Sequence, residues 1–309
     1  MHRILILLII TATSCSKATR ILNESQYMIT TSFDWQGHRG ARGLLPENTL
    51  PAFAHALTYP DVKTLELDIA VTKDQQLVIS HEPWMAALIC THPDGNSVTE
   101  EEEKSLIIHQ MTLPEVQAFD CGSRGNANFP EQQARIVRKP TLAAMVEMAE
   151  QIAHDLKRPL PYYNIEIKSL PEWDETFTPL PDEFARLLLK ELTRLGIAER
   201  TTIQSFDVRS LQAVRQQAPT QSLAYLVANK NTLERNLDTL GFLPEIYSPY
   251  YLLCTPELTQ SLHQQNIQLI PWTVNDPKEM QRLIDMGVDG IITDYPNRIR
   301  KLYTSASLD

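Results

Sequence analysis

The feature that most constrains the fold is a regular alternation of short apolar segments with longer amphipathic ones, which begins at Phe33. Short apolar segments bounded by turn residues are typical of buried β-strands, and longer segments with helical spacing are typical of the helices that cover them. The alternation predicts strands at residues 33–37, 64–71, 163–167, 201–204, 222–227, 245–248, 268–272 and 290–293.

Helical patterns lie between most of these strands, and several carry their own start signals. Asp207 and Thr255 are residues of the N-cap type, and Asn275-Asp276-Pro277 supplies a cap followed by a proline in the first turn. The expected helices span residues 49–57, 142–156, 182–195, 208–217, 232–240, 256–264 and 277–286.

Strands that alternate with helices in this way favour an α/β protein with a (β/α)8 TIM barrel. A doubly wound open sheet would show the same alternation, but no glycine-rich phosphate-binding turn follows the first strand. The alternation breaks at about residues 83–139, which we interpret as an insertion after the second strand that covers the site. The barrel with its insertion is expected to span residues 33–303.

The N-terminus resembles a bacterial export signal. His2 and Arg3 precede an apolar run, Ile4 to Ile10, that is too short to span a bilayer. The following Ala12-Thr13-Ser14-Cys15 resembles the cleavage site of a lipoprotein, so Cys15 is expected to become the lipidated first residue. Plain secretion is the alternative.

This interpretation divides the start of the chain into a signal peptide, residues 1–14, and a linker, residues 15–32. The protein would then be periplasmic, or anchored to a membrane of the cell envelope only through its lipid. Because the net charge is −10 and no run of Lys and Arg interrupts it, nucleic acid is not expected as a partner.

The chain has four cysteines, and three of them follow Cys15. The spacing of these three matches no zinc-binding pattern. Cys90 and Cys121 bracket one segment and could form a disulfide in an oxidising compartment, which would leave Cys254 free. Three reduced or buried thiols are the alternative.

Two carboxylates alternate with apolar residues in the second predicted strand. In Leu65-Glu66-Leu67-Asp68-Ile69 the apolar side chains would face the helices, so both carboxylates would point into the barrel. Burying two like charges is costly without a cation, so one divalent metal ion is expected, and oxygen ligands favour Mg²⁺ or Ca²⁺. Ion pairs with Arg39 or Lys168 are the alternative.

The third predicted strand repeats the pattern in Asn164-Ile165-Glu166-Ile167-Lys168. Glu166 is expected to be the third metal ligand, and Lys168 to meet a phosphate nearer the strand end. His38 and His81 each follow an apolar segment, so two histidines at one barrel rim could exchange protons with a bound phosphodiester. Arg39 offers a planar, two-pronged contact to phosphate oxygens.

Taken together, these motifs resemble those of the glycerophosphodiester phosphodiesterase family. The resemblance covers nearly the whole chain after the linker, from about residue 35 to residue 297. It rests on His38-Arg39-Gly40, Pro46-Glu47-Asn48-Thr49, Glu66-x-Asp68, His81-Glu82-Pro83, Glu166-x-Lys168 and Trp272-Thr273-Val274-Asn275.

The resemblance implies a barrel enzyme that hydrolyses glycerophosphodiesters to sn-glycerol 3-phosphate and an alcohol, through a cyclic phosphate formed by the glycerol 2-hydroxyl. It implies an acid/base pair, a metal site, phosphate-binding cations, a carboxylate that orients the surrounding site residues through His38 or the substrate, and an aromatic contact to glycerol or the leaving group. The implied acid/base pair is His38 and His81, and the implied metal ligands are Glu66, Asp68 and Glu166. The phosphate-binding cations would be Arg39 and Lys168, the orienting carboxylate Glu47, and the aromatic contact Trp272.

Two other functions remain open at this stage. An enzyme of the same scaffold could act on other diesters, such as glycerophosphoinositol or fragments of teichoic acid. A surface lipoprotein could instead bind a ligand through the barrel without turnover, although a pure binder needs neither histidine. The sequence does not predict which alcohol leaves, which of the two metals binds, or the oligomeric state.

Overall fold

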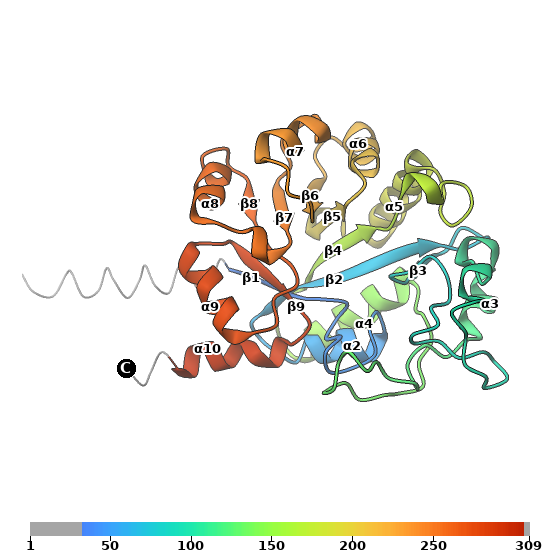
Figure 1. Ribbon diagram of the computed structural model, residues 1–309. Coiled ribbons are helices and arrows are strands. Elements are labelled where there is room, and N and C mark those ends of the chain that lie inside the picture. Colours follow the sequence, from blue (N-terminus) through green and yellow to red (C-terminus); the bar gives the residue numbers. More distant parts are fainter. Residues whose placement is uncertain (1–32, 306–309) are drawn as a thin grey trace, which may run out of the picture. The chain divides into compact units, whose positions relative to one another are not determined.

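The computed structural model describes residues 33–305, which form a parallel eight-stranded barrel with helices between the strands (Figure 1). This confirms the predicted (β/α)8 fold. In the order of the sheet, the barrel strands are β8 (Gln268–Leu269), β7 (Ile246–Pro249), β6 (Ser222–Val227), β5 (Thr201–Ser205), β4 (Tyr162–Ile167), β2 (Val62–Val71), β1 (Asp34–Gly37) and β9 (Gly290–Thr293).

Backbone hydrogen bonds bring the two ends of this sheet together. The N–H of Asp289 donates to the carbonyl of Leu269 at 2.9 Å, and that of Ile292 donates to Pro271 at 3.0 Å. The β8 and β9 edges are therefore joined, although β8 itself is only two residues long. A closed sheet leaves no free strand edge, and its carboxyl ends meet at one rim.

The expected helices are confirmed to within a residue or two at each end. Asp276 shows why they start where they do, because its Oδ1 accepts hydrogen bonds from the N–H groups of Lys278 and Glu279. The helices are α2 (Leu50–Ala56), α4 (Leu142–Asp155), α5 (Pro181–Leu195), α6 (Val208–Gln217), α7 (Leu233–Leu240), α8 (Pro256–His263), α9 (Pro277–Met286) and the further helix α10 (Ile299–Ser305).

The barrel interior is polar on one half and apolar on the other. On the polar half, the amide of Asn164 donates to Gln36 at 2.8 Å and to Gln204 at 3.0 Å, and Gln204 donates to Glu66 at 2.8 Å. On the half formed by β6 to β9, buried apolar side chains cluster instead; they are Ala224, Ile246, Ile270 and Ile292. Any ligand at the rim therefore meets a polar side and an apolar side.

The predicted insertion follows a short strand, β3 (Leu77–Ile79), which pairs antiparallel with the end of β2 and lies outside the barrel order (Figure 1). The insertion contains one short α-helix, α3 (Leu113–Gln117), and two 3-10 helices, and it has a hydrophobic core of its own. Within that core Cys90 and Cys121 form a disulfide, and Cys254 is free and buried. Of the two cysteine alternatives, the structure thus has the disulfide.

The predicted signal peptide, Cys15 and the linker lie outside the described residues. Between residues 33 and 305, no helix has the length and apolar character needed to cross a membrane.

Candidate active site

The first motifs of the sequence lie at the two ends of one tight loop after β1. The N–H of Asn48 donates to the carbonyl of Arg39 at 3.0 Å, which joins the loop ends. Both residues have left-handed backbones, with φ of 49° at Arg39 and 57° at Asn48. Such strain is concentrated at functional sites. Here it turns the Arg39 N–H toward Glu66, at 2.9 Å, and the Asn48 amide toward Asp68, at 2.8 Å.

Gly40 is required between these ends for steric reasons. Its φ is +83°, and a Cβ there would lie 2.6 Å from the backbone carbonyl carbon of Ala52 in α2. The loop therefore packs directly on the first helix, which fixes the position of His38 at the strand end.

The three predicted metal ligands meet inside the barrel rim. Asp68 and Glu166 are in register on the neighbouring strands β2 and β4, and Glu66 precedes Asp68 on the same face. Each of the three offers a carboxylate oxygen within 4.8 Å of the others. Their exposed fractions are 1%, 1% and 7% for Glu66, Asp68 and Glu166. Three buried carboxylates at this spacing could hold a metal ion.

The charges around these carboxylates are only partly balanced by side chains. The ion pairs considered as the alternative do form: Arg39 Nε lies 3.2 Å from Asp68, and Lys168 Nζ lies 2.9 Å from Glu166. Among residues 33–305, Glu66 instead accepts hydrogen bonds only from neutral donors, the Arg39 backbone N–H and the Gln204 amide, and its ionisable partner is His38 at 3.8 Å. Burial and the neighbouring Asp68 raise the pKa of Glu66 well above its ordinary value.

Asp68 supplies a second sign of a cation site. Its Oδ1 is buried and accepts no hydrogen bond within the described part of the chain, and the closest cation, Lys168 Nζ, lies 3.8 Å away. Buried carboxylate oxygens are normally satisfied, so an atom of this kind suits a metal ligand. The all-oxygen donor set fits Mg²⁺ or Ca²⁺ better than zinc.

His38 is held by an acidic residue from the opposite end of the chain. Its Nδ1 lies 2.7 Å from Asp294 Oδ1, and Arg42 Nε donates to the same oxygen at 2.8 Å. Burial and the positive charge of Arg42 lower the pKa of His38 to about 4. A neutral ring that donates its Nδ1–H to Asp294 keeps the lone pair of Nε2 for another proton.

His81 has a parallel arrangement on the other side of the site. Its Nδ1 lies 2.6 Å from Glu82 Oε1, and Lys168 Nζ donates to its Nε2 at 2.9 Å. Although burial opposes it, the contact with His81 lowers the pKa of Glu82 to about 2. The buried Lys139 donates to Ser80 Oγ at 2.8 Å, and Ser80 Oγ donates to the Glu82 carbonyl at 2.6 Å. Both histidines thus have a carboxylate that fixes the ring.

Glu47 contacts the arginines rather than His38. It accepts a hydrogen bond from Arg39 Nη1 at 2.7 Å and lies 3.8 Å from Arg42 Nη1. Burial disfavours the charge of Arg39, but Glu47 and Asp68 together hold its pKa above the ordinary value. The sequence suggested His38 or the substrate as the partner of Glu47; among the described residues its partners are instead Arg39 and Arg42.

A cavity of about 140 Å³ lies at the carboxyl ends of the strands, and its charged and histidine lining comprises His38, Arg39, Arg42, Glu66, His81, Glu166 and Lys168. Its polar side includes both histidines, and its apolar side is lined by Phe206, Leu226, Trp272 and Ile292. Trp272 is fixed by a 2.8 Å hydrogen bond from its Nε1 to the Ser248 carbonyl and by an edge contact with Phe206, 5.3 Å between ring centroids. A larger hollow of about 530 Å³ lies at the opposite strand ends, near Thr201 and Ser222, and contains none of the site residues.

Sequence reasoning did not single out four polar residues that hold the site together. Asp294 and Arg42 position His38. Asn48 supports Asp68, and Lys139 supports the backbone of Glu82 through Ser80. A signal existed for Asp294, which directly follows the last strand at the active rim. Asn48 lay within a recognised motif. Arg42 and Lys139 lie in loops, where no periodicity indicates the partner.

Comparison with known proteins agrees with this geometry. The family model described as "Glycerophosphoryl diester phosphodiesterase family" matches residues 38–298. A curated "Glycerophosphodiester phosphodiesterase" from Caldanaerobacter subterraneus subsp. tengcongensis is 30% identical over 267 residues, which cover 86% of this chain and 95% of that protein.

Solved structures show the same fold. One from Silicibacter pomeroyi, provisionally named a glycerophosphoryl diester phosphodiesterase, is 30% identical with a TM-score of 0.78 and covers 90% of this chain and 95% of its own. A phosphodiesterase from Oleispira antarctica, in complex with the product sn-glycerol-3-phosphate, has a TM-score of 0.68 at 20% identity and covers 88% of this chain and 96% of its own.

Proposed function

This chain belongs to the glycerophosphoryl diester phosphodiesterase family, and we propose that it hydrolyses glycerophosphodiesters to sn-glycerol 3-phosphate and an alcohol. The observation that carries the proposal is a cavity lined by two buried carboxylates, three cationic side chains and two carboxylate-bound histidines, with the third carboxylate, Asp68, beside the other two. The product complex of the relative from Oleispira antarctica supports the choice of product.

Glu66, Asp68 and Glu166 are the residues that would hold one divalent ion, Mg²⁺ or Ca²⁺. When bound, the ion neutralises these carboxylates and lowers the pKa of a hydroxyl that coordinates it. Arg39 and Lys168 line the same cavity and carry charges that suit the phosphate oxygens. The apolar wall around Trp272 suits the carbon chain of glycerol.

The two histidines differ in position, and the difference gives each a role. His38 lines the small cavity, and its neutral ring is a base that takes the proton of the glycerol 2-hydroxyl. His81 lines this cavity and a second one beyond it. When Lys168 contacts the phosphate instead of His81 Nε2, and that nitrogen carries a proton, His81 is the acid that protonates the departing oxygen. Asp294 and Glu82 hold the two rings in orientation.

In the first step the 2-oxygen bonds to phosphorus, the bond to the alcohol breaks, and a cyclic 1,2-phosphate forms. In the second, water attacks phosphorus and gives its proton to His81, while His38 returns a proton to the 2-oxygen. An internal nucleophile avoids the entropic cost of positioning water in the first step. Each histidine ends the cycle in its starting protonation state.

Release of sn-glycerol 3-phosphate from glycerophosphocholine or glycerophosphoglycerol tests the activity. We expect His38→Gln and His81→Gln each to lower kcat by at least about 100-fold, the usual scale of acid/base catalysis. A substrate analogue without the 2-hydroxyl should react orders of magnitude more slowly. Normal turnover of that analogue would exclude the cyclic phosphate, and no turnover of any diester with either metal would favour the ligand-binding alternative.

We also propose that the protein is exported and anchored through a lipid on Cys15, on the basis of the apolar run and the small residues before that cysteine. A lipid anchor would hold the barrel at a membrane of the cell envelope, outside the cytoplasm.

A further inference from the structure

A second cavity of about 370 Å³ adjoins the catalytic one. Arg39, Arg42 and His81 line both cavities, so the two meet at the proposed acid. The other walls come largely from the insertion, through residues between 86 and 89 and between 126 and 129. A group bonded to the far oxygen of a phosphate in the small cavity would project past His81 into this space.

We propose that the second cavity binds the leaving alcohol and selects an uncharged polyhydroxylated alcohol, such as glycerol, inositol or a sugar, over a cationic one such as choline. This inference rests on the proposed function and specifies its substrate class. The volume is within the range of small-ligand sites, about 300–1,000 Å³.

The charges that line the cavity are already paired. Glu47 accepts from Arg39 at 2.7 Å, Glu82 lies 2.6 Å from His81, and Arg42 donates to Asp294 at 2.8 Å. Among the described residues that line the cavity, no carboxylate is therefore left to attract an ammonium group.

A quaternary ammonium could instead be recognised by aromatic faces. Phe129 is the aromatic residue in the described lining, and one face of its ring is covered by Arg42, whose Cζ lies 4.6 Å from the ring centroid. The ring also packs against Tyr295, with centroids 6.4 Å apart. The described lining of the cavity thus offers no aromatic cage that would hold choline.

Amide groups in the wall suit hydroxyls. Asn126 is 8% exposed, and its Oδ1 accepts a hydrogen bond from the Asn128 N–H at 3.0 Å, which leaves its amide N–H group to donate. The side chain of Asn128 is exposed and lines the cavity as well. Amides both donate and accept, as hydroxyls do, so two of them can bind a polyol without carrying charge.

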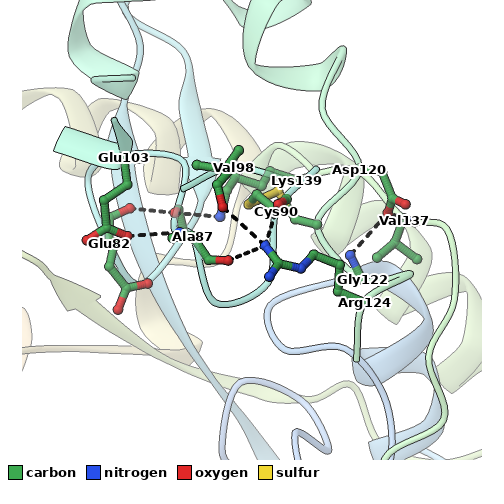
Figure 2. Close-up of a disulfide and its surroundings, with 12 residues drawn as sticks. Glu82, Ala87, Cys90, Val98, Glu103, Asp120, Gly122, Arg124, Val137 and Lys139 are labelled. Carbon is green, nitrogen blue, oxygen red and sulfur yellow. Dashed lines mark hydrogen bonds between the residues drawn. A yellow bond between two sulfur atoms is a disulfide. The ribbon is translucent and has the colours of Figure 1, made fainter. Parts of the chain in front are cut away.

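The walls are tied together before any ligand binds (Figure 2). The disulfide joins Cys90, at the end of one wall segment, to Cys121, before the other. Arg124 Nη1 donates to the carbonyls of Ala87, Cys90 and Val98, the last two at 3.2 and 3.3 Å. A cavity whose walls are fixed in this way loses little entropy when it binds a ligand.

The test measures kcat/KM of the metal-loaded enzyme for four diesters that differ only in the leaving alcohol: glycerol, inositol, choline and methanol. We expect the glycerol and inositol diesters to exceed the choline diester by at least about tenfold. Asn128→Leu should lower the ratio of the polyol diesters to the methyl diester by about 3- to 10-fold, the usual effect of one lost hydrogen bond. Asn128→Asp should raise the choline diester relative to inositol several-fold.

Asn231→Leu is the matched control, because the exposed Asn231 donates its N–H to Asn229 Oδ1 at 2.9 Å, as Asn128 does to Asn126, but lies away from both cavities. It should leave all ratios unchanged. A wild-type preference for choline, or ratios that do not respond to Asn128→Leu, would overturn this subsite while the proposed function stands. No release of glycerol 3-phosphate from any of the four diesters would overturn both.

Discussion

Asp294 is the residue that decides the orientation of the His38 ring. It accepts from the ring at 2.7 Å and is itself held by Arg42 and Asn275. Asp294→Asn keeps the size of the side chain but can place an amide N–H against the ring nitrogen. The lone pair of the histidine would then turn away from the cavity, and we expect kcat to fall by about 100-fold or more with KM little changed. Steady-state kinetics on glycerophosphoglycerol measures this.

The chain contains its own control for that substitution. Asp289 also pairs with a histidine, His263, at 2.9 Å, but outside the catalytic cavity. Asp289→Asn should leave kcat unchanged within about twofold. Equal losses in both variants would mean that Asp294 serves the fold rather than His38.

The buried His38 should also make the unfolding free energy of the metal-free protein depend on pH. Burial and Arg42 lower its pKa from 6.5 to about 4 in the folded state. Between these values the unfolded chain binds a proton that the folded chain does not, so acidification favours unfolding. From pH 7.5 to 4.5 this group should remove roughly 2 to 3 kcal/mol of unfolding free energy.

Urea unfolding at both pH values, with a chelator present, measures this contribution. Between pH 7.5 and 4.5, the unfolding free energy of the His38→Gln variant should fall by roughly 2 to 3 kcal/mol less than that of the wild type, because glutamine does not titrate. If both proteins lose the same free energy, His38 is not held as a buried neutral ring.

At the level of single residues, the site could be predicted from the sequence where strand periodicity fixes the direction of a side chain. Glu66, Asp68 and Glu166 could be placed on one face because they alternate with fully buried apolar residues. Asp294 could not be assigned to His38, because the two are 256 positions apart and meet only when β1 pairs with β9. Long-range contacts of this kind depend on sheet order, which local patterns do not contain.

At the level of elements, every predicted barrel strand and helix is present, because the spacing of apolar residues and the helix caps can be recognised within a short stretch of sequence. The direction of β3 was not predicted from Leu77–Ile79, because a three-residue apolar segment does not reveal whether it continues the barrel or folds back on β2. The insertion was recognised because it breaks the alternation of strands and helices. Its cavity could not be predicted, because it depends on tertiary contacts.

The disulfide should be the main support of the insertion. It closes a loop with a sequence separation of 31 in a segment with little regular secondary structure. Replacing both Cys90 and Cys121 by Ser should cost about 2–5 kcal/mol of local stability. We expect hydrogen exchange and proteolysis to increase within residues 83–139.

Cys254→Ser is the control, because Cys254 is a free thiol in the barrel. It should not change protection of the insertion. Unchanged exchange in the double serine variant would show that the hydrophobic core of the insertion holds it without the disulfide.

At the scale of the whole molecule, the proposed lipid anchor should determine where the protein is located without affecting its catalytic activity. In a bacterium that processes lipoproteins, the wild-type chain should incorporate a labelled fatty acid and sediment with membranes. Cys15→Ala should abolish the label while the purified protein keeps its activity, since the barrel begins with β1 at Asp34. Label retained in Cys15→Ala would place the lipid elsewhere or exclude this anchor.

The central claim is that Glu66, Asp68 and Glu166 hold one divalent ion on which hydrolysis depends. Its most direct test is the rate of sn-glycerol 3-phosphate release from glycerophosphoglycerol by chelator-treated enzyme titrated with Mg²⁺ or Ca²⁺. We predict no turnover without metal, saturable recovery with one equivalent bound, and at least a 100-fold higher metal requirement or no recovery in Glu66→Gln. Full turnover by the metal-free enzyme, or normal recovery in Glu66→Gln, would contradict the claim.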